Sequence, residues 1–417
     1  MKHKTKIIIL IIFIVTLAVI YIMKIWLPNY NANKFQNSIQ SFYDVPSPLP
    51  QGTPGTLIRT EPMNISVPSG GTAYKIMYIS QLPDGAPAIS SGMIFIPNST
   101  APANGRKVVA WAHGTLGFGN ECVPSRSQNP LGDTTNWLDG MMQRGWVVVA
   151  TDYTGLGTSG SPYYLIGKSE ANDVINSVRA ARNFDASNAG TDFIVWGHSQ
   201  GGHSSLFTGV YANTYAPELK LIAVAAAAPA AELNALFSEQ YNKVVSWAIG
   251  PDASVSWPLV YPNLPLDSVL TKKAIKNFKS SAYGCVMKEL GELELKSVFK
   301  EQFFQIDPMT NSAWFSAASA ETPPVSEIKV PIYIAQGLED TVVLPNTTAL
   351  LVEKACTAGK NITVDWLGNT THTQAAVVSG PSVVAWMQDR FNNIPAANSC
   401  TQSLPIAPAT EPSAPTN

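Results

Sequence analysis

The feature that most constrains this fold is a series of short, continuous apolar segments that alternate with helical patterns. Most of them end in Gly or Pro, and they are rich in β-branched residues and lack polar alternation, which is typical of parallel strands buried on both faces. These segments are 107–114, 146–152, 193–198, 221–229, 330–337 and 362–368. Two more, 73–80 and 89–97, flank a Pro-Asp-Gly turn and predict an antiparallel pair. The sequence therefore predicts an α/β fold with an open, mostly parallel sheet and helices on both faces.

One long interval interrupts the alternation of strands and helices. Residues 231–324 contain no buried-strand pattern, and their helical stretches are rich in aromatic side chains. An insertion of about 90 residues is too long for an ordinary loop. We therefore expect a core formed by 69–230 and 325–395, with 231–324 as a helical cap over one end of the sheet.

The N-terminus predicts export. Lys2, Lys4 and Lys6 precede an apolar run from Ile7 to Met23, and no small-residue cleavage site follows it. The run and its flank are long enough to span a bilayer, and the preceding positive charges place the N-terminus in the cytoplasm. We expect residues 1–27 to be an uncleaved signal anchor that tethers an extracytoplasmic body to the membrane; a cleaved signal peptide is the alternative.

The two flanking segments differ in composition from the core. Residues 28–68 are rich in Pro, Ser, Asn and Gln and predict a linker or surface arm, and 396–417 predicts a tail that is flexible beyond Cys400. The net charge of −2 is distributed without a basic stripe, which argues against a nucleic-acid partner.

The four cysteines favour disulfides over a metal site. They lie at widely separated positions, with no C-x-x-C pair and no zinc-ligand spacing, so we expect neither a metal nor a cofactor. In an exported chain an even cysteine number predicts two disulfides, and the sequence leaves all three pairings open. The cysteines are Cys122, Cys285, Cys356 and Cys400.

The stretch Gly197-His198-Ser199-Gln200-Gly201 matches the G-x-S-x-G nucleophile turn. A strand pattern runs directly into the stretch and a helical pattern follows it, which is the context that the motif requires. The turn is so tight that side chains at Gly197 and Gly201 would collide with neighbouring backbone. The sequence thus predicts that Ser199 is a nucleophile at the carboxyl end of the sheet.

A serine nucleophile needs a base, and His372 is the best candidate. It lies in a loop after the last strand, and by parallel topology this loop reaches the sheet edge that carries Ser199. His203 is a weaker alternative, one helical turn into the next helix. His198 should point away from Ser199, so we interpret both neighbours of the serine as bystanders. His113 is expected to fix its own loop.

Asp340 is the expected third member of the triad, because it follows the strand 330–337 at the same edge. The order Ser199, Asp340, His372 is that of α/β-hydrolases. Glu339 is the neighbouring rival, and Asp152 is expected to organise a turn.

Two backbone N–H groups should stabilise the oxyanion. The first belongs to Gln200, the residue after the nucleophile. The second belongs to the loop after strand 107–111, where Thr115 and Leu116 both remain candidates.

The motifs "AWAHGT", "TDYTGLGTSG", "GHSQGG", "GLEDTVV" and "THT", together with the long insertion, resemble the secretory lipases of the α/β-hydrolase superfamily. That resemblance implies catalysis by the residues matching Ser199, Asp340 and His372, and a lid formed by the insertion. It also implies the disulfides Cys122–Cys285 and Cys356–Cys400, the first of which would tie the oxyanion loop to the cap.

The residues and the resemblance together predict an exported carboxylic ester hydrolase acting on lipids or small esters. A serine exopeptidase or oligopeptidase on the same fold is one alternative. A hydrolase fold that binds without catalysis is another, and the complete triad argues against it.

Overall fold

The computed structural model describes residue 23 and residues 27–134, 136–286 and 301–416. The chain divides into two compact units, Met1–Asp44 and Val45–Asn417, and helix α2 (Leu27–Tyr43) belongs to the first. The anchor predicted at 1–27 lies almost entirely outside the described residues. Among the helices that are described, none combines the length and apolarity needed to cross a bilayer.

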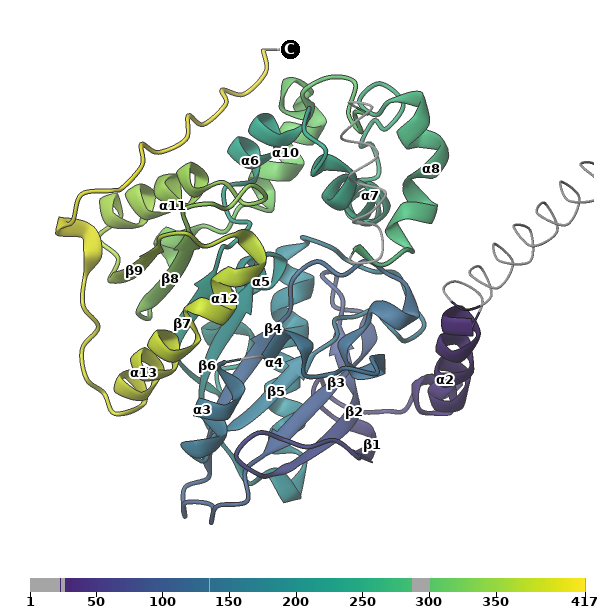
Figure 1. The fold of residues 1–417 in the computed structure, drawn as a ribbon, viewed down its shortest axis with the longest axis vertical. Helices are drawn as coiled ribbons and strands as arrows, with labels where there is room; N and C mark the ends of the chain where they lie inside the picture. Colours follow the sequence, from purple (N-terminus) through teal and green to yellow (C-terminus); the bar gives the residue numbers. More distant parts are fainter. Residues whose placement is uncertain (1–22, 24–26, 135, 287–300, 417) are drawn as a thin grey trace, which may run out of the picture. The chain divides into compact units, whose positions relative to one another are not determined.

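The second unit is organised around one nine-stranded sheet of order β1-β2-β3-β5-β4-β6-β7-β8-β9 (Figure 1). The pairs from β1 to β5 along this order are antiparallel, and all pairs from β5 to β9 are parallel. The eight strands predicted from sequence are confirmed. The strands are β1 (Leu57–Met63), β2 (Thr72–Gln81), β3 (Pro87–Ile96), β4 (Arg106–Ala112), β5 (Val147–Thr151), β6 (Ala189–His198), β7 (Lys220–Ala227), β8 (Ile332–Gly337) and β9 (Ile362–Leu367).

Helices cover both faces of the sheet, as expected for buried parallel strands. One apolar cluster joins alternate strand residues to α4 (Gly167–Arg182), α5 (Gln200–Tyr215) and α11 (Pro345–Thr357). A second cluster joins the intervening strand residues to α3 (Leu138–Gln143) and α13 (Gly380–Phe391). Side chains of neighbouring strand residues point to opposite faces, so the two clusters divide each strand between them.

The segment 231–324 is helical where the structure describes it, apart from an isolated bridge between Leu270 and Phe304. Its helices lie beyond one end of the sheet in Figure 1. They are α6 (Leu233–Gln240), α7 (Ser246–Ser256), α8 (Lys272–Ala282) and α10 (Ser312–Ala320). Several of its aromatic side chains, among them Phe237 and Trp257, belong to the same apolar cluster as α4 and α5. This segment is called the cap below.

Residues 28–68, which the sequence predicts to be a linker or surface arm, include regular secondary structure. They contain helix α2 and the edge strand β1, which pairs with β2. An edge strand has only one partner strand and its exposed residues stay polar, so its composition resembles that of a linker.

The tail is also more ordered than predicted. The backbone N–H of Ala409 donates to the carbonyl of Asn346 at 2.9 Å, and Lys354 pairs with Glu411 at 2.9 Å. The prediction of a flexible tail beyond Cys400 is therefore wrong for the part that runs along α11 (Figure 1).

Candidate active site

The nucleophile turn joins β6 to α5 at Ser199, whose backbone has φ 58° and ψ −117°. A Cβ added at Gly197 would lie 2.1 Å from the carbonyl oxygen of Gly201, and one added at Gly201 would lie 1.8 Å from that of Ala112. Both glycines are therefore required by close backbone approach. The positive φ of a non-glycine residue marks a strained turn, which holds the serine at the end of the sheet.

Ser199, His372 and Asp340 form one continuous hydrogen-bonded chain. His372 Nε2 lies 2.9 Å from Ser199 Oγ, and His372 Nδ1 lies 2.7 Å from Asp340 Oδ2. The other oxygen of Asp340 accepts the backbone N–H groups of Val342 at 2.8 Å and Val343 at 3.0 Å. This arrangement orients the imidazole so that Nε2 can take a proton from the serine.

The rival carboxylates lie elsewhere or have other partners. Glu339 is exposed, and Asp365 accepts the hydroxyl of Tyr333 at 2.5 Å. Buried Asp152 accepts hydrogen bonds from Ser91 Oγ at 2.6 Å and from the backbone N–H of Ser125 at 3.0 Å. Asp152, which directly follows β5, thus joins strand β3 to the turn that contains Ser125, in agreement with the organising role expected for it.

His198, interpreted from sequence as a bystander, contacts the candidate base. Its Nε2 lies 2.9 Å from the carbonyl oxygen of His372, and the two rings are 4.7 Å apart. Burial lowers the pKa of His198 to about 3, so the imidazole is neutral and Nε2 donates to that carbonyl. The contact arises because the loop after β9 crosses the end of β6, which strand alternation alone does not predict.

His203 is fully buried behind the turn and binds Glu170 and Glu321 rather than Ser199. Its Nδ1 lies 2.8 Å from Glu170 Oε2, and its Nε2 lies 2.8 Å from the carbonyl oxygen of Glu321. Neither Glu170 nor Glu321 was expected near the site. Their sequence context shows no motif, so no signal could have identified them.

The candidate oxyanion donors surround the serine from two sides. Gln200 is the first residue of α5, where backbone N–H groups have no partner within the helix. On the other side, a Cβ added at Gly114 would lie 3.4 Å from Ser199 Cβ, so the loop that carries Thr115 and Leu116 passes directly beside the nucleophile. The loop that carries both candidates for the second oxyanion donor therefore lies beside Ser199.

The cap fixes this oxyanion loop through covalent and backbone contacts. Phe118 N donates to the carbonyl of Ala282 at 2.7 Å, and Val286 N donates to that of Leu116 at 3.0 Å. Both disulfides implied by the resemblance are present, and Cys122–Cys285 joins the same two segments.

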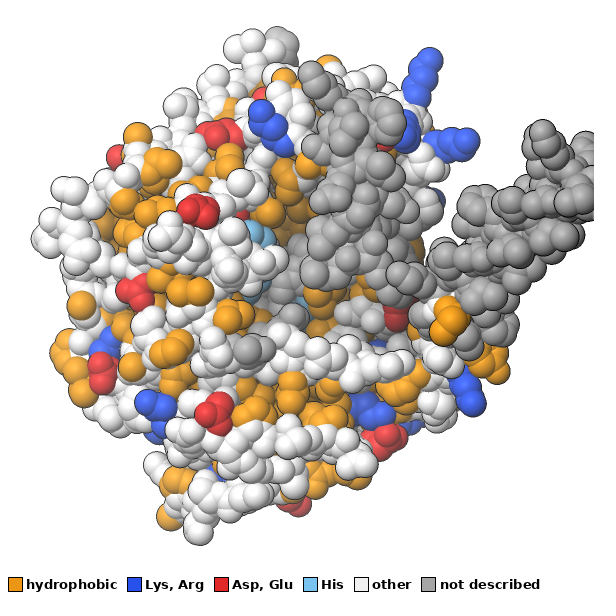
Figure 2. Space-filling model, viewed as in Figure 1, with side chains coloured by type: hydrophobic (Ala, Val, Ile, Leu, Met, Phe, Trp, Pro, Cys, Tyr) orange, Lys and Arg blue, Asp and Glu red, His pale blue; other side chains and the backbone are white. Residues whose placement is uncertain are grey.

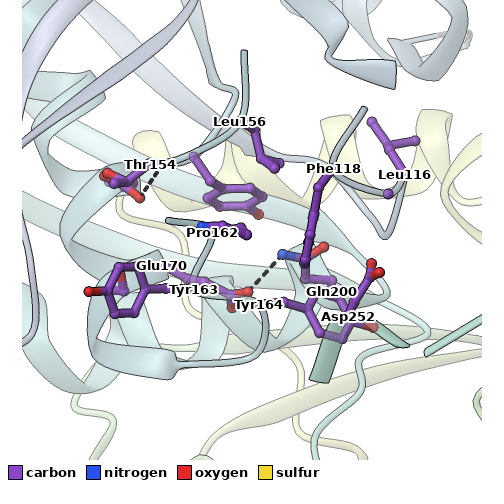
Figure 3. Close-up of a pocket in the computed structure, with 14 residues that line it drawn as sticks. Leu116, Phe118, Thr154, Leu156, Pro162, Tyr163, Tyr164, Glu170, Gln200 and Asp252 are labelled. Carbon is purple, nitrogen blue, oxygen red and sulfur yellow. Dashed lines mark hydrogen bonds between the residues drawn. The ribbon is translucent and has the colours of Figure 1, made fainter. Parts of the chain in front are cut away.

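A narrow pocket with a cavity volume of only about 10 Å³ lies between the oxyanion loop and the start of α4. Its lining combines aromatic rings with carboxyl groups, among them Tyr164 and Asp173. Figure 3 shows the Gln200 amide hydrogen-bonded to Glu170. Leu116 and Phe118 lie on the side of Gln200 that is away from Glu170. In the space-filling view, histidine side chains are visible in a hollow bordered by hydrophobic side chains (Figure 2). Among the described residues, no cluster of His, Cys, Asp and Glu could hold a metal ion.

The sequence matches the family described as secretory lipase over residues 132–399. It is 24% identical to Lipase A of Arthroderma benhamiae over 406 residues, which covers 89% of this chain and 83% of the relative. It is also 22% identical to a probable inactive lipase of Mycobacterium tuberculosis, over 85% of this chain and 82% of that protein.

Among solved structures, Candida antarctica lipase A in its closed state superposes with a TM-score of 0.69 at 18% identity, covering 88% of this chain and 89% of that one. The rice cell wall degrading esterase LipA from Xanthomonas oryzae gives a TM-score of 0.67 at 18% identity, covering 82% and 99%. These likenesses show an α/β-hydrolase fold.

Proposed function

Because the chain belongs to the secretory lipase family and is thus a carboxylic ester hydrolase, we propose that it cleaves esters through an acyl-enzyme formed on Ser199. The observation that carries this proposal is the hydrogen-bonded chain from Ser199 through His372 to Asp340. It matters because a relative of similar length is named as a probable inactive lipase, so family membership alone does not guarantee turnover.

The reaction proceeds in two halves. Ser199 Oγ attacks the ester carbonyl carbon while His372 Nε2 takes the hydroxyl proton, and Asp340 stabilises the imidazolium that forms. The tetrahedral oxyanion accepts hydrogen bonds from Gln200 N and from a backbone N–H of Thr115 or Leu116. The C–O bond then breaks, and His372 gives its proton to the leaving alcohol.

The second half repeats this chemistry with water. His372 takes a proton from water as the water oxygen attacks the acyl carbon, and the returning proton releases Ser199 with the free carboxylic acid. No metal or cofactor enters any of these steps.

The proposal predicts that Ser199→Ala lowers kcat for a p-nitrophenyl ester by at least about 1,000-fold, because the acyl-enzyme can no longer form. A fluorophosphonate probe should label the wild type and leave the variant unlabelled. Ser177→Ala is the matched control, since it removes a buried serine hydroxyl from α4, remote from the triad, and should keep near wild-type turnover. Wild-type turnover or labelling in Ser199→Ala would refute the proposal.

The substrate class is a lipid or a small ester, with the aromatic cap lying over the acyl side. Ester turnover measured from acetate to palmitate with one leaving group would separate a lipase from an esterase of short acyl chains. A peptide p-nitroanilide series serves as the comparison, and turnover faster than that of every ester would favour the peptidase alternative.

We also propose that the body is exported and stays tethered by residues 1–27. The support is the lysine-flanked apolar run, together with a secretory family. N-terminal sequencing of the mature protein from a membrane fraction should begin at the first residues of the chain. A start beyond residue 27, with the protein in the soluble fraction, would show a cleaved signal instead.

A further inference from the structure

Glu170 is a buried carboxylate that accepts four hydrogen bonds behind the nucleophile turn. Its Oε1 accepts Leu165 N at 2.9 Å and Gln200 Nε2 at 2.8 Å. Its Oε2 lies 2.8 Å from His203 Nδ1 and accepts Ser204 Oγ at 2.8 Å. Both oxygens of Glu170 thus face donor groups, an arrangement that suits a carboxylate.

His203 carries the compensating positive charge. With both ring nitrogens protonated, His203 donates to the carboxylate of Glu170 and to the carbonyl oxygen of Glu321. Burial alone would favour neutral imidazole, but the charge and hydrogen bond of Glu170 raise the pKa of His203 above its ordinary value. The pair is fully buried and neutral as a whole.

Three of the four contacts of Glu170 fall on the first turn of α5. Gln200, His203 and Ser204 stand at positions i, i+3 and i+4 of one helix face. This turn has no side-chain N-cap and directly follows the strained Ser199. A helix end without a cap frays readily, and here that end carries the N–H group of Gln200.

We propose that Glu170 and His203 are positioning residues for the oxyanion hole, an inference that rests on the proposed ester hydrolase function. Glu170 clamps the first turn of α5 and so fixes Gln200 N. His203 cancels the negative charge of Glu170, which would otherwise oppose the oxyanion forming beside Gln200.

The cap contributes to this arrangement through Glu321. Glu321, directly after α10, gives its carbonyl to His203, while its carboxyl oxygens accept Gly167 N at 2.7 Å and Tyr261 hydroxyl at 2.6 Å. The carboxyl of Glu321 is thus bound to α4 and to the cap, and its charge helps to raise the pKa of His203. The cap therefore fixes the side of the ring opposite Glu170.

If His203 acts by compensating the charge of Glu170, and not only by packing, the two single substitutions should differ in their effect on kcat. In Glu170→Gln, the new amide can donate to His203 Nδ1, and neutral His203 still donates to Glu321. The clamp survives without either charge, so kcat should fall less than about fivefold. In His203→Gln, the carboxylate stays buried without its counter-charge, and kcat should fall about 10- to 100-fold with KM within about twofold.

The decisive variant is the double substitution Glu170→Gln with His203→Gln. Because it removes the uncompensated carboxylate, its kcat should exceed that of His203→Gln by at least about fivefold, and it should melt at a higher temperature. The matched control is Thr208→Val, which removes a buried hydroxyl one turn further along α5 and should keep wild-type kcat.

The experiment measures kcat, KM and thermal unfolding of the full-length protein with a p-nitrophenyl ester. Wild-type kcat in His203→Gln, or a double variant slower than His203→Gln, would overturn the inference. If His203→Gln does not fold, recovery of folding and turnover in the double variant supports the inference, and failure of both contradicts it. These comparisons are independent of Ser199→Ala, whose retained turnover would refute the proposed function itself.

Discussion

At the scale of single residues, the contacts of the two histidines near Ser199 could not be predicted from sequence. The sequence predicts His372, 173 positions from the serine, as the base, and the structure brings His372 to 2.9 Å from Ser199 Oγ. The interpretation of both neighbouring histidines as bystanders does not agree with their contacts. His198 binds the backbone of His372, and His203 forms a buried ion pair with Glu170. Their roles depend on residues far away in the chain, which no local pattern reports.

The contact between His198 and His372 should contribute to turnover. His198→Phe keeps a ring beside His372 but removes the donor to its carbonyl oxygen, which loosens the loop that carries the base. We expect kcat to fall about tenfold, since small displacements of a base are costly. His198→Gln places an amide donor near the lost Nε2 and should recover part of that loss in the same assay. Equal kcat for wild type and His198→Phe would contradict this role.

Asp173 should make stability depend on pH. Burial raises its pKa to about 6, and the nearby charge of Glu170 adds to this rise. A raised pKa means that the folded state holds this proton more tightly than the unfolded state does. The contribution of protonated Asp173 to the free energy of unfolding is therefore complete below about pH 4 and is lost as pH rises through about 6.

Asp173→Asn removes this dependence. The unfolding free energy of the variant relative to wild type should rise between pH 4 and pH 7 by up to about 3 kcal/mol. Urea unfolding at several pH values measures this difference. Ser177→Ala, on the same helix, should shift stability by an amount that does not vary with pH. A difference for Asp173→Asn that is constant with pH would show that its pKa is not raised.

At the scale of elements, patterns of polarity predicted the central strands but did not predict the edge strand β1. The central strands are apolar throughout because both faces are covered, and such runs are recognisable from sequence alone. The edge strand β1 has few buried residues, so its composition resembled a linker. Helix α4 begins at Gly167, and polar residues in its first turns, Glu170 among them, are buried by distant partners.

The turn between β6 and α5 should tolerate no side chain at Gly201. A methyl group there would meet the carbonyl oxygen of Ala112 on the central strand β4, which cannot move without disturbing the sheet. Gly201→Ala should therefore destabilise the protein by at least about 3 kcal/mol or prevent folding. Gly368→Ala is the control, because its added Cβ meets nothing within 4 Å, and its effect should be small. Chemical unfolding of both variants gives the comparison.

At the scale of the whole molecule, the cap contacts three of the segments that carry the candidate chemistry. It holds the oxyanion loop through Cys122–Cys285 and the nucleophile helix through Glu321. It also holds the loop of Asp340, because Gln240 in α6 donates to the carbonyls of Thr341 and Val342, at 2.9 Å each. The cap thus supports the site in addition to lying over the end of the sheet.

The C-terminal tail should contribute to stability but not to turnover. Truncation after Leu404 removes the hydrogen bond from Ala409 to Asn346 and the ion pair between Glu411 and Lys354. One hydrogen bond and one partly exposed pair together contribute about 1–2 kcal/mol, so the melting temperature should fall by a few degrees. We expect unchanged kcat. A truncated protein that melts like the full chain, or that loses turnover, would contradict this assignment.

The sequence by itself determined the positions of the strands along the chain, the nucleophile turn and the edge of the sheet where the triad was expected to assemble. These follow from local rules, since apolar runs, glycines in tight turns and parallel topology act on neighbouring residues or on whole strands. Tertiary structure alone decided which buried polar groups meet. The charge of His203, the clamp by Glu170 and the contact of His198 each require a partner from another element. Such groups are stable inside a protein only through those partners, and the partners are fixed by packing that the linear pattern does not contain.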